Sequence, residues 1–152
     1  MTFSYSLTRT FQMLSAVVLL AALASSAQAS VDDAHSFAME AAAPYVEQGF
    51  IVREDYYNGE VKSGQKLMVK QQLYKGNDYA FWLGTANDKC KFEIHVYDEK
   101  GKPIQIAPTM GTGEYFTSVR VNPPKTGTYT VVFSITSKTE VGIFWALAYG
   151  YR

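Results

Sequence analysis

The sequence has 152 residues, of which 14% are aromatic, and its 14 basic and 14 acidic side chains give a formal net charge of zero. This length suits one domain with a single hydrophobic core. The balanced charge excludes the basic excess that marks a surface for nucleic acid or anionic membranes, so we expect no nucleic-acid partner. Cys90 is the only cysteine, which excludes an internal disulfide and leaves stability to the packed core.

The first 29 residues have the three parts of a secretory signal peptide. Arg9 is the only charged residue before Asp32, an apolar run follows at residues 13–24, and residues 27–29 read Ala-Gln-Ala, a small-x-small cleavage pattern. The apolar run is shorter than the roughly 20 residues of a membrane span. We therefore predict a cleaved signal over residues 1–29, a periplasmic or extracellular protein, and no stable membrane insertion after cleavage.

Residues 30–49 are predicted to form one helix. Three of its residues recur at a spacing of four and so share one face: Phe37, Ala41 and Tyr45. Pro44 lacks the N–H that a helix interior uses, which predicts a kink or break near it. Gly49 is predicted to end the helix.

Residues 50–152 have the pattern of short β-strands separated by turn residues. Seven segments have strand composition: residues 67–74, 79–85, 90–97, 102–107, 115–121, 127–135 and 141–149. Residues 50–53 can begin an eighth strand, whereas Asn58-Gly59 and Ser63-Gly64 are turn signals. Because no helices separate the strands, the sequence predicts a mainly β fold, an antiparallel sandwich of seven or eight strands with one N-terminal helix.

Two turns carry more detailed predictions. Residues 98–101 read Asp-Glu-Lys-Gly, and Gly101 is placed for the left-handed conformation of a hairpin turn. Tyr129, in Thr-Gly-Thr-Tyr, resembles a corner tyrosine whose hydroxyl ties a loop to a strand. Both features are interpreted as structural.

Three stretches have a distinctive order and spacing: residues 73–81 (LYKGNDYAF), 92–101 (FEIHVYDEKG) and 124–132 (PKTGTYTVV). Together they resemble the bacterial pre-peptidase C-terminal (PPC-like) domain family over about residues 60–150. The resemblance implies a jelly-roll-like β-sandwich that serves exported proteins in secretion, substrate binding or matrix binding, sometimes with calcium. The acidic residues in the middle of the family's strand are poorly matched here by Lys91 and Glu93, so calcium is possible but not favoured.

Few side chains suit catalysis. The two histidines are His35, near the helix start, and His95, on the same strand face as Glu93. The sequence contains no H-E-x-x-H, G-x-S-x-G or C-x-x-C motif, and its acid–amide pairs suit tight turns better than calcium. We therefore predict no catalytic residue, no metal ligand and no cofactor. The alternative is a small periplasmic enzyme that uses His95 and Glu93.

Four aromatic residues point away from the apolar faces of their strands: Trp82, Tyr97, Phe116 and Phe144. If they share one outer sheet face, they form a platform that stacks on sugars or buries a partner. Alternatively, the N-terminal helix covers this face with its own apolar residues. The predicted function is an exported, non-catalytic binding or accessory module for a glycan, an envelope protein or a secreted enzyme.

Overall fold

The computed structural model describes residues 31–87, 89–104, 106–107, 109–138 and 142–152. The predicted signal peptide over residues 1–29 lies outside these described residues. Within them, no helix is both long and apolar enough to cross a membrane.

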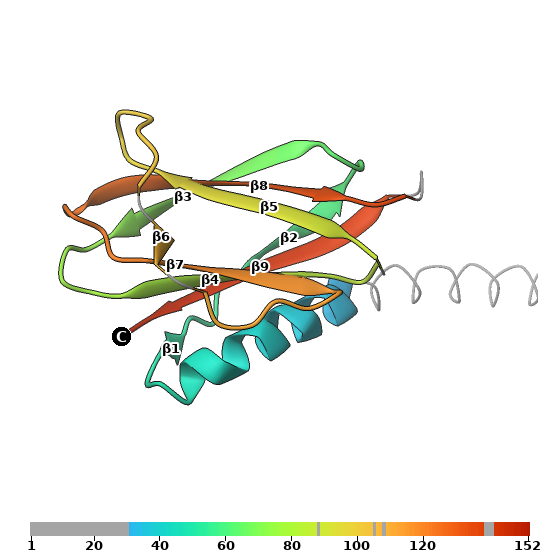
Figure 1. Cartoon of the computed structure of the whole chain (residues 1–152), viewed down its shortest axis with the longest axis horizontal. Helices are drawn as coiled ribbons and strands as arrows, with labels where there is room; N and C mark the ends of the chain where they lie inside the picture. Colours follow the sequence, from blue (N-terminus) through green and yellow to red (C-terminus); the bar gives the residue numbers. More distant parts are fainter. Residues whose placement is uncertain (1–30, 88, 105, 108, 139–141) are drawn as a thin grey trace, which may run out of the picture. The chain divides into compact units, whose positions relative to one another are not determined.

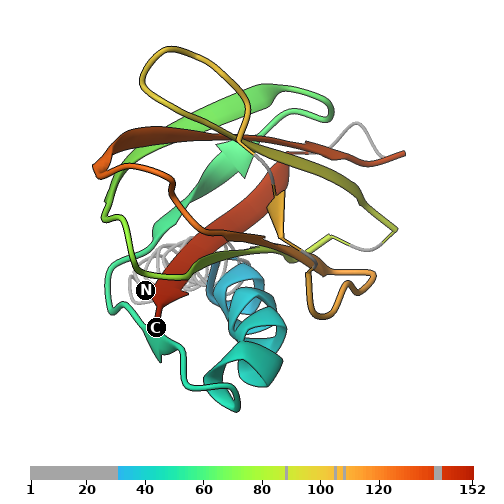
Figure 2. The ribbon, with the colours of Figure 1, turned by 60° about the vertical axis from the view of Figure 1, so that its left-hand side comes forward.

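Two antiparallel sheets stack face to face, and a helix covers the outer face of the larger sheet (Figure 1, Figure 2). The larger sheet has the order β1 (Ile51–Val52), β9 (Ile143–Tyr151), β4 (Tyr79–Thr85), β7 (Phe116–Val121) and β6 (Ile106–Ala107), and β2 (Tyr57–Val61) also pairs with β9. The smaller sheet has the order β3 (Lys66–Leu73), β8 (Gly127–Thr136) and β5 (Lys91–Tyr97). The predicted mainly β antiparallel sandwich with one N-terminal helix is confirmed.

The chain changes sheet at nearly every step from β2 to β9, which is typical of jelly-roll sandwiches. The described residues hold nine strands rather than seven or eight, because β2 forms a strand where the sequence predicted turns, and β1 and β6 are short strands of two residues each. The segment predicted as one strand over residues 102–107 is divided between the sheets. Pro103 bridges to Tyr97 of the smaller sheet, whereas β6 pairs with β7 of the larger sheet.

One predicted turn lies inside a strand. Asn58 and Gly59 are in β2, where Gly59 is opposite Trp145 of β9. A Cβ atom at Gly59 would lie 3.4 Å from Nε1 and Cζ2 of the Trp145 indole, so the glycine accommodates a large neighbouring ring rather than a chain reversal. The second turn signal is correct: Gly64 has a φ of 77° in the connection between β2 and β3.

The core between the sheets follows the alternation of the strands. Four alternate residues of β8 are buried there: Tyr129, Val131, Phe133 and Ile135. The Phe133 ring meets the Trp145 ring edge to face, with 5.0 Å between their centroids. The Tyr129 hydroxyl donates a hydrogen bond of 2.8 Å to the Lys125 carbonyl, which confirms the predicted corner tyrosine.

The helix occupies residues 31–46 of the described chain and packs on the outer face of the larger sheet. Its small residues allow a close approach, and the backbone of Ala34 and Ala38 leaves no room for a Cβ atom at Gly84 of β4. The helix continues through Pro44 to residue 46 rather than breaking at the proline. Pro44 lies in the last turn, so the hydrogen bond to the Glu40 carbonyl that proline cannot make is lost near the helix end, with only two helical residues after it.

A turn at Gly49 caps the C-terminal end of the helix, in agreement with the prediction that Gly49 ends it. Gly49 has a φ of 90°, its N–H donates to the Val46 carbonyl at 3.0 Å, and the Phe50 N–H donates to the Tyr45 carbonyl at 3.1 Å. The Phe50 ring also meets the Tyr45 ring edge to face at 5.3 Å. These contacts form a Schellman motif with its usual hydrophobic contact.

Candidate binding site

Three turns meet at one end of the sandwich, on the left in Figure 1. They are the β3–β4 turn at residues 74–78, the hairpin at residues 98–102, and the β7–β8 turn at residues 122–126. The Lys75 N–H donates to the Thr126 hydroxyl at 3.0 Å, and the Thr128 N–H donates to the Glu99 carboxylate at 2.9 Å. We call this region the turn end. Loops held by a rigid sandwich are a common place for binding sites.

A cavity of about 330 Å³ opens at the turn end between the edges of the two sheets. It is lined by four tyrosines, Tyr74, Tyr79, Tyr149 and Tyr151, with Gln71, Gln72, Asn77 and Arg53. We call it the tyrosine pocket. It forms where the edge of the larger sheet is interrupted. β1 and β2 both pair with β9, and the Arg53 N–H still donates to the Tyr149 carbonyl of β9 at 2.9 Å, but residues 54–56 lie outside both pairings. Across this gap lies β3, an edge strand of the smaller sheet.

Hydrogen bonds fix much of the pocket wall. The Tyr149 hydroxyl donates to the Asp55 carboxylate at 2.8 Å. The Tyr79 hydroxyl accepts from the Tyr74 N–H at 3.0 Å and from the Asn77 amide at 3.2 Å. In the part of the chain that the structure describes, the hydroxyls of Tyr74 and Tyr151 make no hydrogen bond, so they are available to a ligand.

Burial and the hydrogen bond to Asp55 raise the pKa of Tyr149, and burial raises the pKa of Tyr57 beside the pocket. The unfolded chain ionises these hydroxyls at a lower pH than the folded chain does. The stability that they contribute is therefore fully present below about pH 10 and is lost as the pH rises through the raised pKa.

We expect Tyr149→Phe to remove part of this alkaline loss of stability, because phenylalanine has no proton to release. The measurement is the free energy of urea unfolding of both proteins between about pH 9 and about pH 11. The variant should lose less stability over this range than the parent protein does. Equal losses in the two proteins would contradict the assignment.

The four aromatic candidates do not form one platform, which corrects the sequence-based prediction. Trp82 is fully buried beneath the helix, and its ring meets Tyr45 of the helix with 5.6 Å between centroids. Tyr97 lies on β5 in the smaller sheet, whereas Phe116 and Phe144 are half-buried in the larger sheet. Alternation along the strands correctly placed Trp82 on an outer face, but the helix covers that face.

The alternative, a covering helix, is therefore correct for Trp82. Ala41 and Tyr45 of the helix pack into the same buried cluster as Trp82. Phe37, the third residue of the predicted helix face, lies to one side and stacks on Tyr115 at 4.5 Å between centroids.

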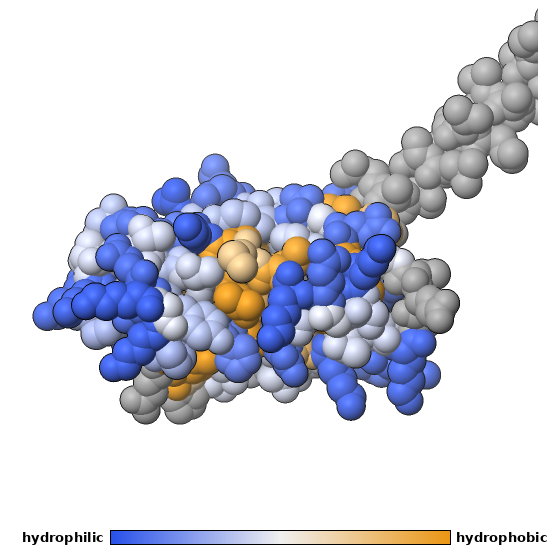
Figure 3. Space-filling view, turned by 90° about the horizontal axis from the view of Figure 1, so that it is seen from above, coloured by the Kyte–Doolittle hydropathy of each residue, from blue (hydrophilic) through white to orange (hydrophobic). Residues whose placement is uncertain are grey.

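The two histidines lie in different places. His35 stacks on Tyr56 with 4.0 Å between ring centroids. His95 and Glu93 are exposed on the outer face of the smaller sheet, where hydrophilic side chains surround a small apolar area (Figure 3). The depression beside them has a volume of about 30 Å³, about that of one water molecule. Among the described residues, no group of three or more His, Cys, Asp or Glu side chains is placed to hold a metal ion.

No family model matches this chain, and no curated protein matches it in sequence. Among solved structures, it is similar to PliG of Aeromonas hydrophila, a periplasmic inhibitor of g-type lysozyme, with a TM-score of 0.46 and 14% identity over 69% of this chain and 90% of that chain. It is also similar to part of the Bacillus licheniformis lipase BlEst2 in its propeptide form, with a TM-score of 0.40 and 17% identity over 63% of this chain and 21% of that chain.

Proposed function

We propose that this protein is an exported, non-catalytic module that binds a neutral glycan in the tyrosine pocket. The composition of the pocket carries the proposal: four tyrosines and three amide side chains line a cavity of about 330 Å³. Ligand pockets in proteins begin at about 300 Å³. A sugar ring presents an apolar C–H face and a rim of hydroxyls. Tyrosine rings suit the first, and amides, which both donate and accept hydrogen bonds, suit the second.

The charge of the pocket favours a neutral ligand. Arg53 is the charged residue of the lining, and its guanidinium lies 3.4 Å from the Asp55 carboxylate. The Asp55 carboxylate also accepts the Tyr149 hydroxyl, which lowers the pKa of Asp55 and keeps it ionised at neutral pH. The positive charge of Arg53 therefore has a negative neighbour, and the pocket presents little net charge.

The first 29 residues support export to the periplasm or the medium, because they have the parts of a signal peptide. The resemblance of residues 60–150 to PPC-like domains supports an accessory role beside secreted enzymes. In this proposal the module holds a glycan and performs no chemistry on it.

The test is a thermal melt of the protein with a panel of neutral oligosaccharides. A ligand at 100 times its dissociation constant adds about 2.7 kcal/mol to the folded state, which raises the melting temperature. Tyr74→Ala should weaken binding of the active sugar about tenfold, or 1.4 kcal/mol, because Tyr74 is 55% exposed and its ring is free to stack.

Tyr97→Ala is the matched control, because Tyr97 is a partly exposed tyrosine of the smaller sheet that is absent from the pocket lining. It should bind the sugar as the parent protein does. The glycan proposal would be overturned if no oligosaccharide in the panel raised the melting temperature, or if Tyr74→Ala and Tyr97→Ala lost affinity for the sugar equally. The alternative enzyme would instead show an activity that His95→Ala abolishes without unfolding the protein.

A further inference from the structure

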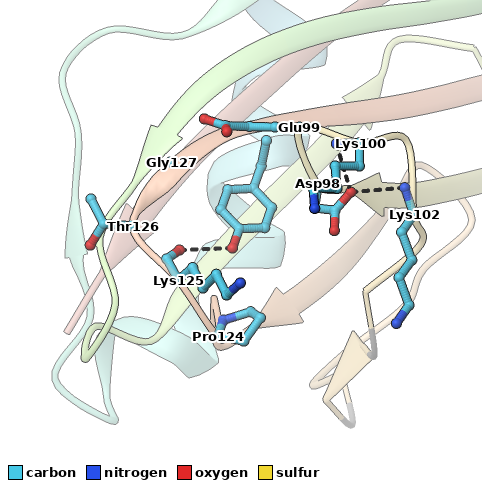
Figure 4. A pocket seen from close by; sticks show the side chains of 9 residues that line it. Asp98, Glu99, Lys100, Lys102, Pro124, Lys125, Thr126 and Gly127 are labelled. Carbon is cyan, nitrogen blue, oxygen red and sulfur yellow. Dashed lines mark hydrogen bonds between the residues drawn. The ribbon is translucent and has the colours of Figure 1, made fainter.

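A second cavity at the turn end has a different chemistry from the tyrosine pocket. It has a volume of about 370 Å³ and lies between the hairpin at residues 98–102 and the turn that precedes β8 (Figure 4). Three lysines line it, Lys100, Lys102 and Lys125, together with two acidic residues and the Tyr129 ring. We call it the lysine pocket.

Backbone N–H groups donate hydrogen bonds to both acidic side chains of the lysine pocket. Asp98 Oδ1 accepts the N–H groups of Lys100 at 2.9 Å and Lys102 at 2.8 Å, while Gly101 takes the left-handed conformation with a φ of 74°. The predicted hairpin turn is thus confirmed. Glu99 lies across the start of β8, where its carboxylate accepts the Thr128 N–H at 2.9 Å. Each carboxylate therefore accepts backbone N–H groups, Asp98 within its own turn and Glu99 at the start of β8.

The three lysines are exposed, and in the described part of the chain none of them forms an ion pair. Their backbone positions are nevertheless fixed. The Asp98 hydrogen bonds hold Lys100 and Lys102 on one wall, and the Tyr129 hydroxyl holds the Lys125 carbonyl on the other. Three lysines thus line one concave site on a chain whose overall charge is zero.

We propose that the lysine pocket binds an oxyanion, a carboxylate, sulfate or phosphate group, through Lys100, Lys102 and Lys125. Each ammonium group carries three donors and no acceptor, which suits the several acceptor oxygens of such a group. Because the lysines are exposed, binding should weaken as the salt concentration rises. The inference does not depend on the glycan proposal, since it concerns a separate cavity and a charged ligand.

The test is a titration of the ¹⁵N-labelled protein with sodium sulfate, inorganic phosphate and an oligogalacturonate at low ionic strength. Binding is measured from the changes in the amide chemical shifts. We expect saturable shifts at the amides of residues 98–102 and 124–128. The double variant Lys102→Gln/Lys125→Gln should weaken the affinity at least tenfold. The three probes distinguish a small inorganic anion from the carboxylates of an acidic polysaccharide.

The matched control is Lys62→Gln/Lys66→Gln, which removes the same charge from exposed lysines before and at the start of β3, at the other end of the sandwich. It should keep the parent affinity. Shifts that never saturate with any of the three probes, or an equal loss in the control, would overturn the proposal in favour of general attraction between charges. Tyr74→Ala should leave the anion titration unchanged, so failure of one pocket does not imply failure of the other.

Discussion

Replacing Gly84 with alanine is expected to separate the N-terminal helix from the larger sheet. A Cβ atom at this position would overlap the carbonyl oxygen of Ala34 and the amide nitrogen of Ala38, both in the helix backbone. Backbone atoms cannot rotate away as a side chain does, so the whole helix must move. Overpacking in a core costs about 1–3 kcal/mol, and we expect the upper end of this range or more, because the helix also loses contact with Trp82.

The effect of Gly84→Ala is measured by urea unfolding and by tryptophan fluorescence, whose emission should shift to longer wavelength as Trp82 becomes exposed. Gly59→Ala is the control, because it makes the same change in another strand of the same sheet, where the new methyl group meets the Trp145 ring at 3.4 Å, an ordinary contact distance. The control should change stability little. An equal loss in both variants would mean that any methyl group in this sheet is harmful.

Trp82→Ala is expected to be the other most damaging substitution. The Trp82 side chain is fully buried, lies against the backbone of Gly150 in the neighbouring strand, and meets Tyr45 of the helix. Truncation of a buried tryptophan to alanine costs about 3–5 kcal/mol through lost contacts and the cavity that remains. The free energy of urea unfolding measures this loss.

Trp82→Phe separates the size of the side chain from its polarity. The Trp82 Nε1 atom is buried and has no hydrogen-bond partner among the described residues. A phenylalanine therefore gives up no hydrogen bond and removes an unsatisfied donor. We expect it to cost well below what alanine costs, because phenylalanine refills most of the cavity that alanine leaves. A cost near that of alanine would show that Nε1 has a partner in solution, such as a water molecule.

For the strands with clean alternation, most of the predicted ends lie within two residues of the observed ends. β4 was predicted with its observed bounds, and β5 and β8 each differ by one residue at an end. The failures have a common physical cause. Gly59 in β2 and Pro103 beside β5 resemble turn or strand residues locally, but their roles depend on contacts outside their own segments, with Trp145 and with Tyr97.

The candidate site was less predictable than the fold. Alternation shows which face of a strand a residue occupies but not what lies over that face, so the sequence could not show that the helix covers Trp82. The tyrosine pocket depends on residues 54–56 lying outside the pairings of β1 and β2 with β9, and those pairings join segments far apart in the sequence. The sequence did offer one signal: tyrosines occur near the ends of β3, β4 and β9, beside the Gln71-Gln72 pair.

The central position of β9 has a consequence for folding kinetics. β9 pairs with β1, β2 and β4, all of which precede it in the chain, so the larger sheet cannot close until the last strand has emerged from the ribosome. Such long-range pairing gives a high contact order and slow folding. In the proposed role as an exported protein, delayed folding would be an advantage, because a nascent chain that lacks β9 has no completed larger sheet to resist translocation.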